Sequence, residues 1–115
     1  DTEGEYVYAF DVQPDGSCRN KRPFVRLLEP EQGSLGMRCR GDGMGLDSEG
    51  RLHVGTGVGV QVIDPKGRHL GIIRVPSAVR NLAFSGRDRR TLYMTAFDTL
   101  YRVRMVSRGP AGRAK

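Results

Sequence analysis

The chain has 115 residues, enough for one ordinary domain or part of one and too short for two. Apolar residues make up 37% and charged residues 28%, with 16 glycines and 6 prolines, which argues against a disordered chain and indicates a globular protein with many tight turns. The net charge is +6, but the arginines that cause it are scattered rather than gathered in a stripe, so we expect no nucleic-acid partner.

The sequence also lacks signs of a membrane segment or a zinc site. No run approaches the roughly 20 apolar residues of a membrane span and no signal-peptide core is found, so we expect no membrane partner and a cytoplasmic location. Cys18 and Cys39 have neither a CxxC pattern nor a nearby histidine, so they predict no zinc site. We favour two reduced thiols, and a disulfide stays open. Because the sequence starts at Asp1 without Met, we expect further residues upstream.

Short apolar runs with a period of two predict nine β-strands, and no window of the length of a helix keeps a helical period. The expected strands span residues 6–13, 22–28, 44–47, 52–56, 60–64, 70–75, 81–85, 92–96 and 100–106. Three of the turns end in Gly16, Gly50 and Gly67, and glycine accepts the positive φ that a hairpin demands. These turns predict antiparallel strands, since parallel strands need long crossovers.

The chain resembles itself with a period of about 40 residues. Residues 46–56 have a counterpart in residues 82–96, and residues 60–64 have one in residues 100–104. Residues 7–12 are an earlier copy of the second element. A repeat of this length that holds four strands is typical of a propeller blade.

The repeats predict an all-β fold, a β-propeller fragment of about two to two and a half four-stranded antiparallel blades. The expected parts are the outer two strands of one blade (6–28), a whole blade (43–75) and the inner three strands of another (79–106). Residues 1–106 form the propeller part, and residues 107–115 are expected to be a flexible tail. Open strand edges and apolar blade faces predict self-association of the fragment.

Residues 42–54 (DGMGLDSEGRLHV) resemble the DGMxxDxxGxLxV signature of the SMP-30/gluconolactonase/regucalcin-like family. Residues 59–67 and 81–95 resemble the following blade of that family in the same order and spacing, and residues 8–16 resemble the preceding blade. The resemblance covers nearly the whole chain, as the C-terminal portion of such a protein. One departure is Gly41, because the residue before the Asp of the motif is commonly Pro.

The resemblance implies a six-bladed propeller that holds one divalent cation in its central channel and hydrolyses a sugar lactone to the aldonic acid. Calcium is the first choice of cation, with zinc, magnesium or manganese as alternatives. Of the family's metal ligands, a Glu, an Asn and the Asp of the DGM motif, only the last maps onto this chain, as Asp42. The others would lie in the remaining N-terminal blades, which are therefore the expected partner, and the isolated fragment would be inactive.

Asp42 is the expected metal ligand and catalytic residue. A carboxylate at the start of an innermost strand would point into the channel, and hard divalent cations prefer anionic oxygen. The same carboxylate would double as general base in hydrolysis. From the residues alone, an Asp that caps the turn before Gly43 would be the favoured interpretation, and the resemblance reverses that order.

Two neighbours are candidates for substrate binding. Asn81 stands at the corresponding start of the next blade's inner strand, where its amide would face the channel or satisfy backbone groups. Arg80 would meet an acidic substrate or product, or lie in solvent.

The remaining polar residues are interpreted as structural. Asp11, Asp47 and Asp64 recur at turn positions of the repeats, which indicates turn formation. His53 is expected to pack in mid-strand and His69 to be exposed, and neither has a Ser or Cys partner for nucleophilic catalysis.

Two other functions remain open at this point. A non-catalytic NHL-like propeller would use similar blades as a binding surface, and a strictosidine-synthase-like propeller would share the architecture without the DGM ligand. An upstream Glu and Asn facing Asp42 would favour the lactonase.

Overall fold

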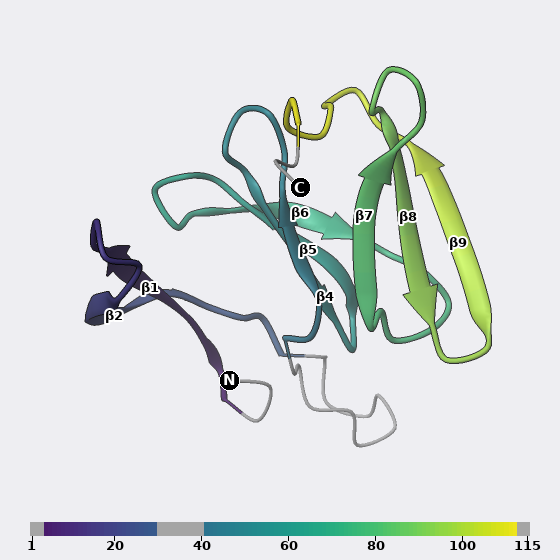
Figure 1. Ribbon diagram of the computed structural model, residues 1–115. Coiled ribbons are helices and arrows are strands. Elements are labelled where there is room, and N and C mark those ends of the chain that lie inside the picture. Colours follow the sequence, from purple (N-terminus) through teal and green to yellow (C-terminus); the bar gives the residue numbers. More distant parts are fainter. Residues whose placement is uncertain (1–3, 30–40, 113–115) are drawn as a thin grey trace.

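The computed structural model describes residues 4–29 and 41–112 (Figure 1), and within them the chain forms nine β-strands and no helix. The strands are β1 (Tyr6–Val12), β2 (Cys18–Arg26), β3 (Met44–Leu46), β4 (Leu52–Thr56), β5 (Gly59–Ile63), β6 (His69–Ile73), β7 (Asn81–Ser85), β8 (Thr91–Ala96) and β9 (Thr99–Arg104). All nine expected strands are confirmed. The largest difference is at β2, which starts at Cys18 rather than at residue 22, while Cys39 lies outside the described residues.

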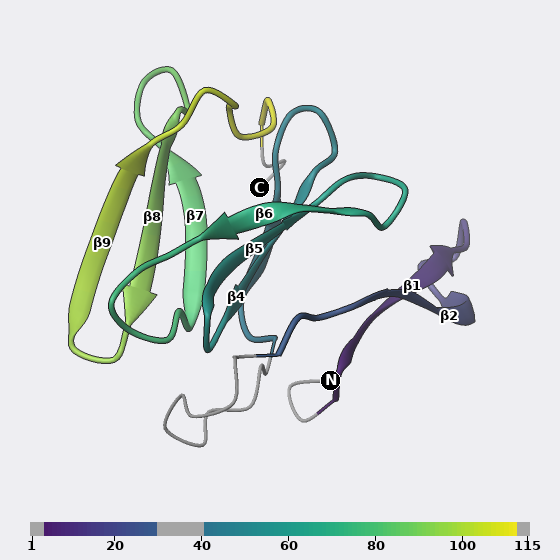
Figure 2. The same cartoon turned by 180° about the vertical axis from the view of Figure 1, so that it is seen from behind.

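The strands form three antiparallel sheets that follow one another in chain order. They contain β1–β2, then β3–β4–β5–β6, then β7–β8–β9, and each strand pairs with its neighbour in sequence. The two opposite views in Figures 1 and 2 show the sheets side by side in chain order, with β1–β2 at one side, β4–β6 in the middle and β7–β9 at the other side. Sheets of two, four and three strands fit the predicted outer hairpin of one blade, complete blade and inner three strands of another. No helix in these described segments has the length and apolar character needed to cross a membrane.

Two apolar clusters hold the sheets together, one on each face of the middle sheet. The first joins Val25 and Leu27 to Leu52, Val54 and Ile63, and the second joins Val60 to Val79, Leu82, Leu92 and Met94. Strand β4 is buried along its whole length because both of its faces meet a neighbouring sheet. Burial of this kind stabilises a fold by about 25 cal/mol per Å² of apolar surface.

The turns have the conformation that their glycines predict. Gly16, Gly50 and Gly67 have φ values of 83°, 76° and 84°, in the left-handed region where a side chain is disfavoured. The N–H of Gly50 donates to the carbonyl of Asp47 at 3.1 Å, and the N–H of Gly67 donates to that of Asp64 at 3.0 Å. The prediction of hairpin turns with positive φ is confirmed.

Two buried polar side chains sit between the sheets. Gln61 is 0% exposed, and its amide accepts from the N–H of Leu28 and donates to the carbonyl of Leu28, both at 2.9 Å, which fixes the first blade to the second. His53 is 1% exposed and meets Phe84 edge-on with the ring centroids 5.1 Å apart, so its packing role is confirmed. His69 is half-buried rather than exposed, because its Nε2 lies 2.9 Å from the carbonyl oxygen of Arg26 on the adjacent blade.

The segment after β9 runs back along the turns of the two preceding sheets. The N–H of Ser48 donates to the carbonyl of Arg108, and the N–H of Gly109 donates to that of Arg89, both at 2.8 Å. Gly109 is buried against Phe84, where a Cβ atom would lie 2.5 Å from the Phe84 Cβ.

Candidate active site between the first strands of two blades

The first strands of the second and third sheets, β3 and β7, lie beside each other. Asp42 comes two residues before β3, and Arg80 comes one residue before β7. The N–H of Gly43 donates to the carbonyl of Arg80 at 2.7 Å and so ties the two strand starts together. The structure therefore brings all three predicted site residues, Asp42, Arg80 and Asn81, to one place.

Asp42 and Arg80 occupy equivalent positions in successive blades. The N–H of Asp42 donates to the carbonyl of Gly55 at 2.9 Å, and the N–H of Arg80 donates to that of Thr95 at 2.8 Å. Both acceptors are the penultimate residue of the second strand of their sheet. Asn81 is the first residue of β7, as expected, but the residue equivalent to Asp42 is Arg80.

Gly43 is required for the close approach of the two strands. A Cβ atom at this position would lie 2.2 Å from the Oδ1 of Asn81 and 2.7 Å from its Cα, so any side chain would collide with β7. Asn81 Oδ1 accepts from the N–H of Leu82 at 2.8 Å, which is the backbone-satisfying interpretation of this residue. Its Nδ2 has no hydrogen-bond partner among the described residues.

The Asp42 carboxylate is left largely open. Its side chain is 39% exposed, and its only charged partner within residues 4–29 and 41–112 is Arg80, whose Nη1 lies 3.6 Å from Oδ2. The guanidinium of Arg80 also stacks over Phe97, with Cζ 4.5 Å from the ring centroid. Sequence reasoning missed Phe97, although an aromatic residue in a short hairpin turn was a visible signal.

Asp47 and Asp64 use their carboxylates in a different way. Asp47 is 3% exposed, and its Oδ1 accepts from the N–H groups of Glu49 and Arg51 while its Oδ2 accepts from Arg51 Nε at 2.6 Å. Asp64 makes the same three bonds with Lys66 and Arg68. The prediction that these two residues form turns is confirmed.

Those hydrogen bonds also control ionisation. Burial alone would raise the pKa of Asp47, but the hydrogen bonds from Arg51 and Glu49 outweigh it and lower the pKa below its usual value. The backbone hydrogen bond from Arg68 is the main reason why the pKa of Asp64 is lowered. Both groups therefore stay ionised as parts of the turn.

Asp11 is structural, but it does not form a turn. It lies within β1, and its carboxylate accepts from Asn20 Nδ2 at 2.9 Å and Arg22 Nη1 at 2.8 Å across the hairpin. The turn role that the repeats gave to Asp11 belongs to Asp15, whose Oδ1 accepts from the N–H of Ser17 at 2.9 Å. The physical reason is that the hairpin β1–β2 has register shifts, so the repeat alignment does not hold to the residue there.

The donor chemistry at Asp42 suits one ligand of a hard cation but not a whole ligand shell. The exposed Asp42 carboxylate offers oxygen atoms of the kind that such cations prefer. Among the residues that the structure describes, no group of three or more His, Cys, Asp and Glu side chains converges on a common point. Further ligands would have to come from outside the described residues.

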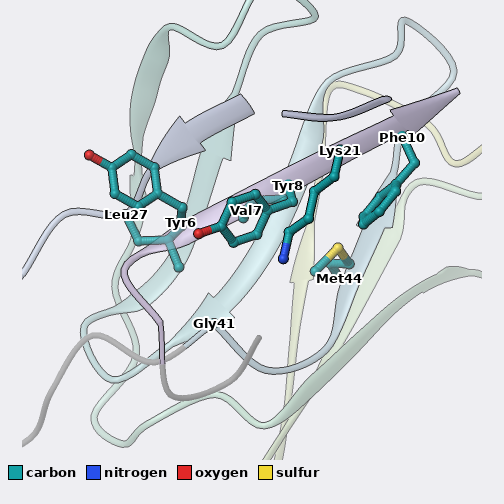
Figure 3. Close-up of a pocket in the computed structure, with 8 residues that line it drawn as sticks. All are labelled: Tyr6, Val7, Tyr8, Phe10, Lys21, Leu27, Gly41 and Met44. Carbon is teal, nitrogen blue, oxygen red and sulfur yellow. The ribbon is translucent and has the colours of Figure 1, made fainter. Parts of the chain in front are cut away.

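A hollow of 190 Å³ lies between β1 and the start of β3 (Figure 3). It is lined by Tyr6, Val7, Tyr8, Phe10, Lys21, Leu27, Gly41 and Met44. Its one charged group, the Lys21 ammonium, lies 4.2 Å from the centroid of the Tyr8 ring. With an apolar lining and no carboxylate, this hollow does not suit metal-assisted hydrolysis.

Comparison with known proteins shows which family this chain belongs to. The sequence model of the SMP-30/gluconolactonase/LRE-like region matches residues 1–98. The chain belongs to this family. The matched residues include Asp42, Arg80 and Asn81.

Two lactonohydrolases of Aspergillus oryzae (strain ATCC 42149 / RIB 40) are similar to this chain along almost its whole length. The lactonohydrolase oryH is 31% identical over 111 residues, and the lactonohydrolase oryL is 32% identical over 108 residues. These alignments cover 96% and 93% of this chain but only 22% and 23% of the relatives. The chain thus spans less than a quarter of the length of these relatives.

Solved structures show the same fold. An X-ray structure of a proposed gluconolactonase aligns with a TM-score of 0.81 at 26% identity, over 97% of this chain and 36% of the other. A gluconolactonase of Xanthomonas campestris aligns with a TM-score of 0.72 at 26% identity, over 86% of this chain and 30% of the other. A luciferin-regenerating enzyme, at 24% identity and a TM-score of 0.75, shares the fold.

Proposed function

We propose that this chain supplies part of the active site of an enzyme that hydrolyses a sugar lactone. Support comes from its family and from similarity to two lactonohydrolases and to a gluconolactonase. The observation that carries the proposal is the open carboxylate of Asp42, which lies beside the Arg80 guanidinium where two blades begin and where Asn81 packs against Gly43.

Asp42 is our candidate ligand for a divalent cation, with calcium as the first choice and zinc, magnesium or manganese as alternatives. Its side chain is 39% exposed, and within residues 4–29 and 41–112 its carboxylate accepts from no backbone N–H group, unlike those of Asp47 and Asp64. A Glu and an Asn from the remaining blades would complete the ligand set. When bound, such a cation would polarise the lactone carbonyl and lower the pKa of a water molecule.

The three residues of this chain would each serve one part of the hydrolysis. Water adds to the carbonyl carbon, the acyl C–O bond of the ring breaks, the ring oxygen takes up a proton, and the new carboxyl group ionises. The Asp42 carboxylate would accept a proton from the attacking water. Asn81 Nδ2 would donate a hydrogen bond to a substrate oxygen, and the Arg80 guanidinium would attract the carboxylate product.

The first blade indicates where the remaining blades would attach. The hairpin β1–β2 corresponds to β5–β6 of the complete blade, so strands equivalent to β3 and β4 would pair with the open edge of β1. They would cover the apolar hollow, where Tyr6 and Phe10 are 38% and 45% exposed. We therefore expect the fragment by itself to be inactive and to self-associate.

The test is cation binding and hydrolysis by the full-length protein and its Asp42→Asn variant. We expect the variant to lose at least about 100-fold in kcat/KM for glucono-δ-lactone, because an amide binds a cation more weakly and is not a base. A pH-stat measures hydrolysis, and calorimetric titration with CaCl₂ measures binding. Asp11→Asn makes the same change at an exposed cross-strand pair and should keep full activity. Equal activity of the Asp42→Asn variant and the wild type would refute the role of Asp42.

A further inference from the structure

Phe97 is an unusual residue for its place in the fold. It is the first of the two residues that connect β8 to β9, it has a φ of 28°, and it is 68% exposed. Residues with a side chain rarely adopt a positive φ, and an exposed aromatic ring adds no burial energy to the fold. The equivalent turn, between β4 and β5, has Gly57 at this position, so the hairpin itself does not need an aromatic residue.

The contacts of the ring supply a reason for its presence. Arg80 Cζ lies 4.5 Å from the ring centroid, and Arg80 Nη1 lies 3.6 Å from Asp42 Oδ2. The backbone of Arg80 is fixed as well, since its N–H donates to Thr95 and its carbonyl accepts from Gly43. A guanidinium held over an aromatic face loses much of the freedom that an exposed arginine otherwise has.

The position of Arg80 places this charge beside Asp42. Arg80 and Asp42 make the same backbone hydrogen bond at the start of successive blades, so their side chains leave the backbone at equivalent places. A guanidinium there is a counter-ion for Asp42 in the absence of a cation and repels a divalent cation that binds to Asp42. Asp98, the charged residue that follows Phe97 in the turn between β8 and β9, accepts a hydrogen bond from the hydroxyl of Thr99.

We propose that Phe97 is a positioning residue that holds the Arg80 guanidinium beside Asp42, and that this fixed positive charge weakens divalent-cation binding at Asp42. The proposal rests on the proposed function, because it takes Asp42 as the ligand. It assigns to Arg80 a control of cation affinity in addition to its contact with product.

The test is calorimetric titration of the full-length protein with CaCl₂. Arg80→Gln should tighten calcium binding by about three- to tenfold at low salt, and the gain should shrink as ionic strength rises, because the cause is a charge near the surface. Phe97→Leu should give a smaller gain, and Phe97→Tyr should bind as the wild type does. Arg87→Gln, in the turn at the other end of β7, makes the same change in net charge and should have no effect.

Nuclear magnetic resonance gives a readout that does not depend on calcium. The Arg80 Nε–H signal, assigned by its absence in Arg80→Gln, should show slow guanidinium rotation in the wild type and averaged rotation in Phe97→Leu. Wild-type affinity in Arg80→Gln, or averaged rotation in the wild type, would overturn the proposal. If Asp42→Asn binds calcium as the wild type does, the proposed function fails and this inference fails with it, whereas an effect of Asp42→Asn without one of Arg80→Gln refutes only the inference.

Discussion

Two aspartate–arginine pairs in this chain have the same chemistry and opposite surroundings. At the Asp47–Arg51 turn, the carboxylate has no exposed surface, receives two backbone N–H groups and lies 2.6 Å from the arginine Nε. At the start of β3, Asp42 is 39% exposed and lies 3.6 Å from Arg80. The first carboxylate is saturated, and the second is open to a ligand.

The difference separates a residue that builds the fold from one that is available for chemistry. A buried carboxylate needs every hydrogen bond it has, so its replacement acts on stability. An exposed ion pair contributes little to stability, typically below about 1 kcal/mol, so its replacement should act on function. The two kinds of aspartate cannot be told apart by residue type, and each can be tested by substitution.

The largest effect should follow from Asp42→Asn, and it should be confined to activity. With hydrolysis reduced at least about 100-fold, the melting temperature should stay within about 2 °C of the wild type, because only an exposed pair is lost. Differential scanning calorimetry of the full-length protein measures this. A large fall in melting temperature would mean that Asp42 belongs with the structural aspartates.

Asp47→Ala should show the reverse pattern. Removing this carboxylate leaves the Arg51 Nε–H and two backbone N–H groups without their acceptor, while Arg51 Nη2 keeps its ion pair with Glu49, and we expect the free energy of unfolding to fall by about 2–4 kcal/mol. Urea denaturation measures the loss, and kcat per folded molecule should be unchanged. Unchanged stability would contradict the structural role.

The same turn predicts a pH dependence. The pKa of Asp47 is lower in the folded chain than in the unfolded chain. Its contribution to the free energy of unfolding is therefore fully present above the unfolded pKa of about 3.9, and it is lost as the pH falls through the folded pKa. The Asp47→Ala variant should therefore approach the stability of the wild type in strong acid.

His53 should produce a moderate pH effect at higher pH. Burial lowers its pKa, opposed by its hydrogen bond with the Arg51 carbonyl and by the charge of Asp47. Below the unfolded pKa of about 6.5, the unfolded chain binds more protons at this histidine than the folded chain does. The contribution of neutral His53 to stability is therefore fully present above that pH and falls as the pH drops toward the folded pKa. Urea midpoints between pH 7.5 and 5 should show this fall, and a His53→Gln variant should show less of it. The same change at the second histidine of the chain, His69→Gln, is the control.

The smallest effect is expected at the exposed pair of Asp11 and Arg22, whose side chains are 44% and 53% exposed. Asp11→Asn should leave the urea midpoint within experimental error, since solvent screens the pair. A clear loss would show that exposure is a poor guide to which aspartates are structural in this chain.

The fold could be predicted because the strands of a blade carry a period-two apolar pattern and end at glycine turns. The start of β2 was missed because its first residues are exposed on both faces, so no apolar pattern marks them. The buried Gln61 could not be predicted either, because its partner Leu28 lies in another blade, 33 positions away.

The sequence leads to three of the four residues of the candidate site. Asp42 came from the family resemblance, and Asn81 and Arg80 came from the repeat. Phe97 was missed because its contact with Arg80 joins a turn to the start of β7, and repeats align strands more reliably than turns.

The most direct test of the open carboxylate is a crystal structure of the full-length protein with calcium, recorded at a long wavelength to locate the cation by anomalous scattering. The account predicts a calcium ion at about 2.3–2.6 Å from an oxygen of Asp42, with the Asp47 carboxylate still bonded to Arg51. A calcium ion bound elsewhere, with Asp42 free of it, would contradict the account.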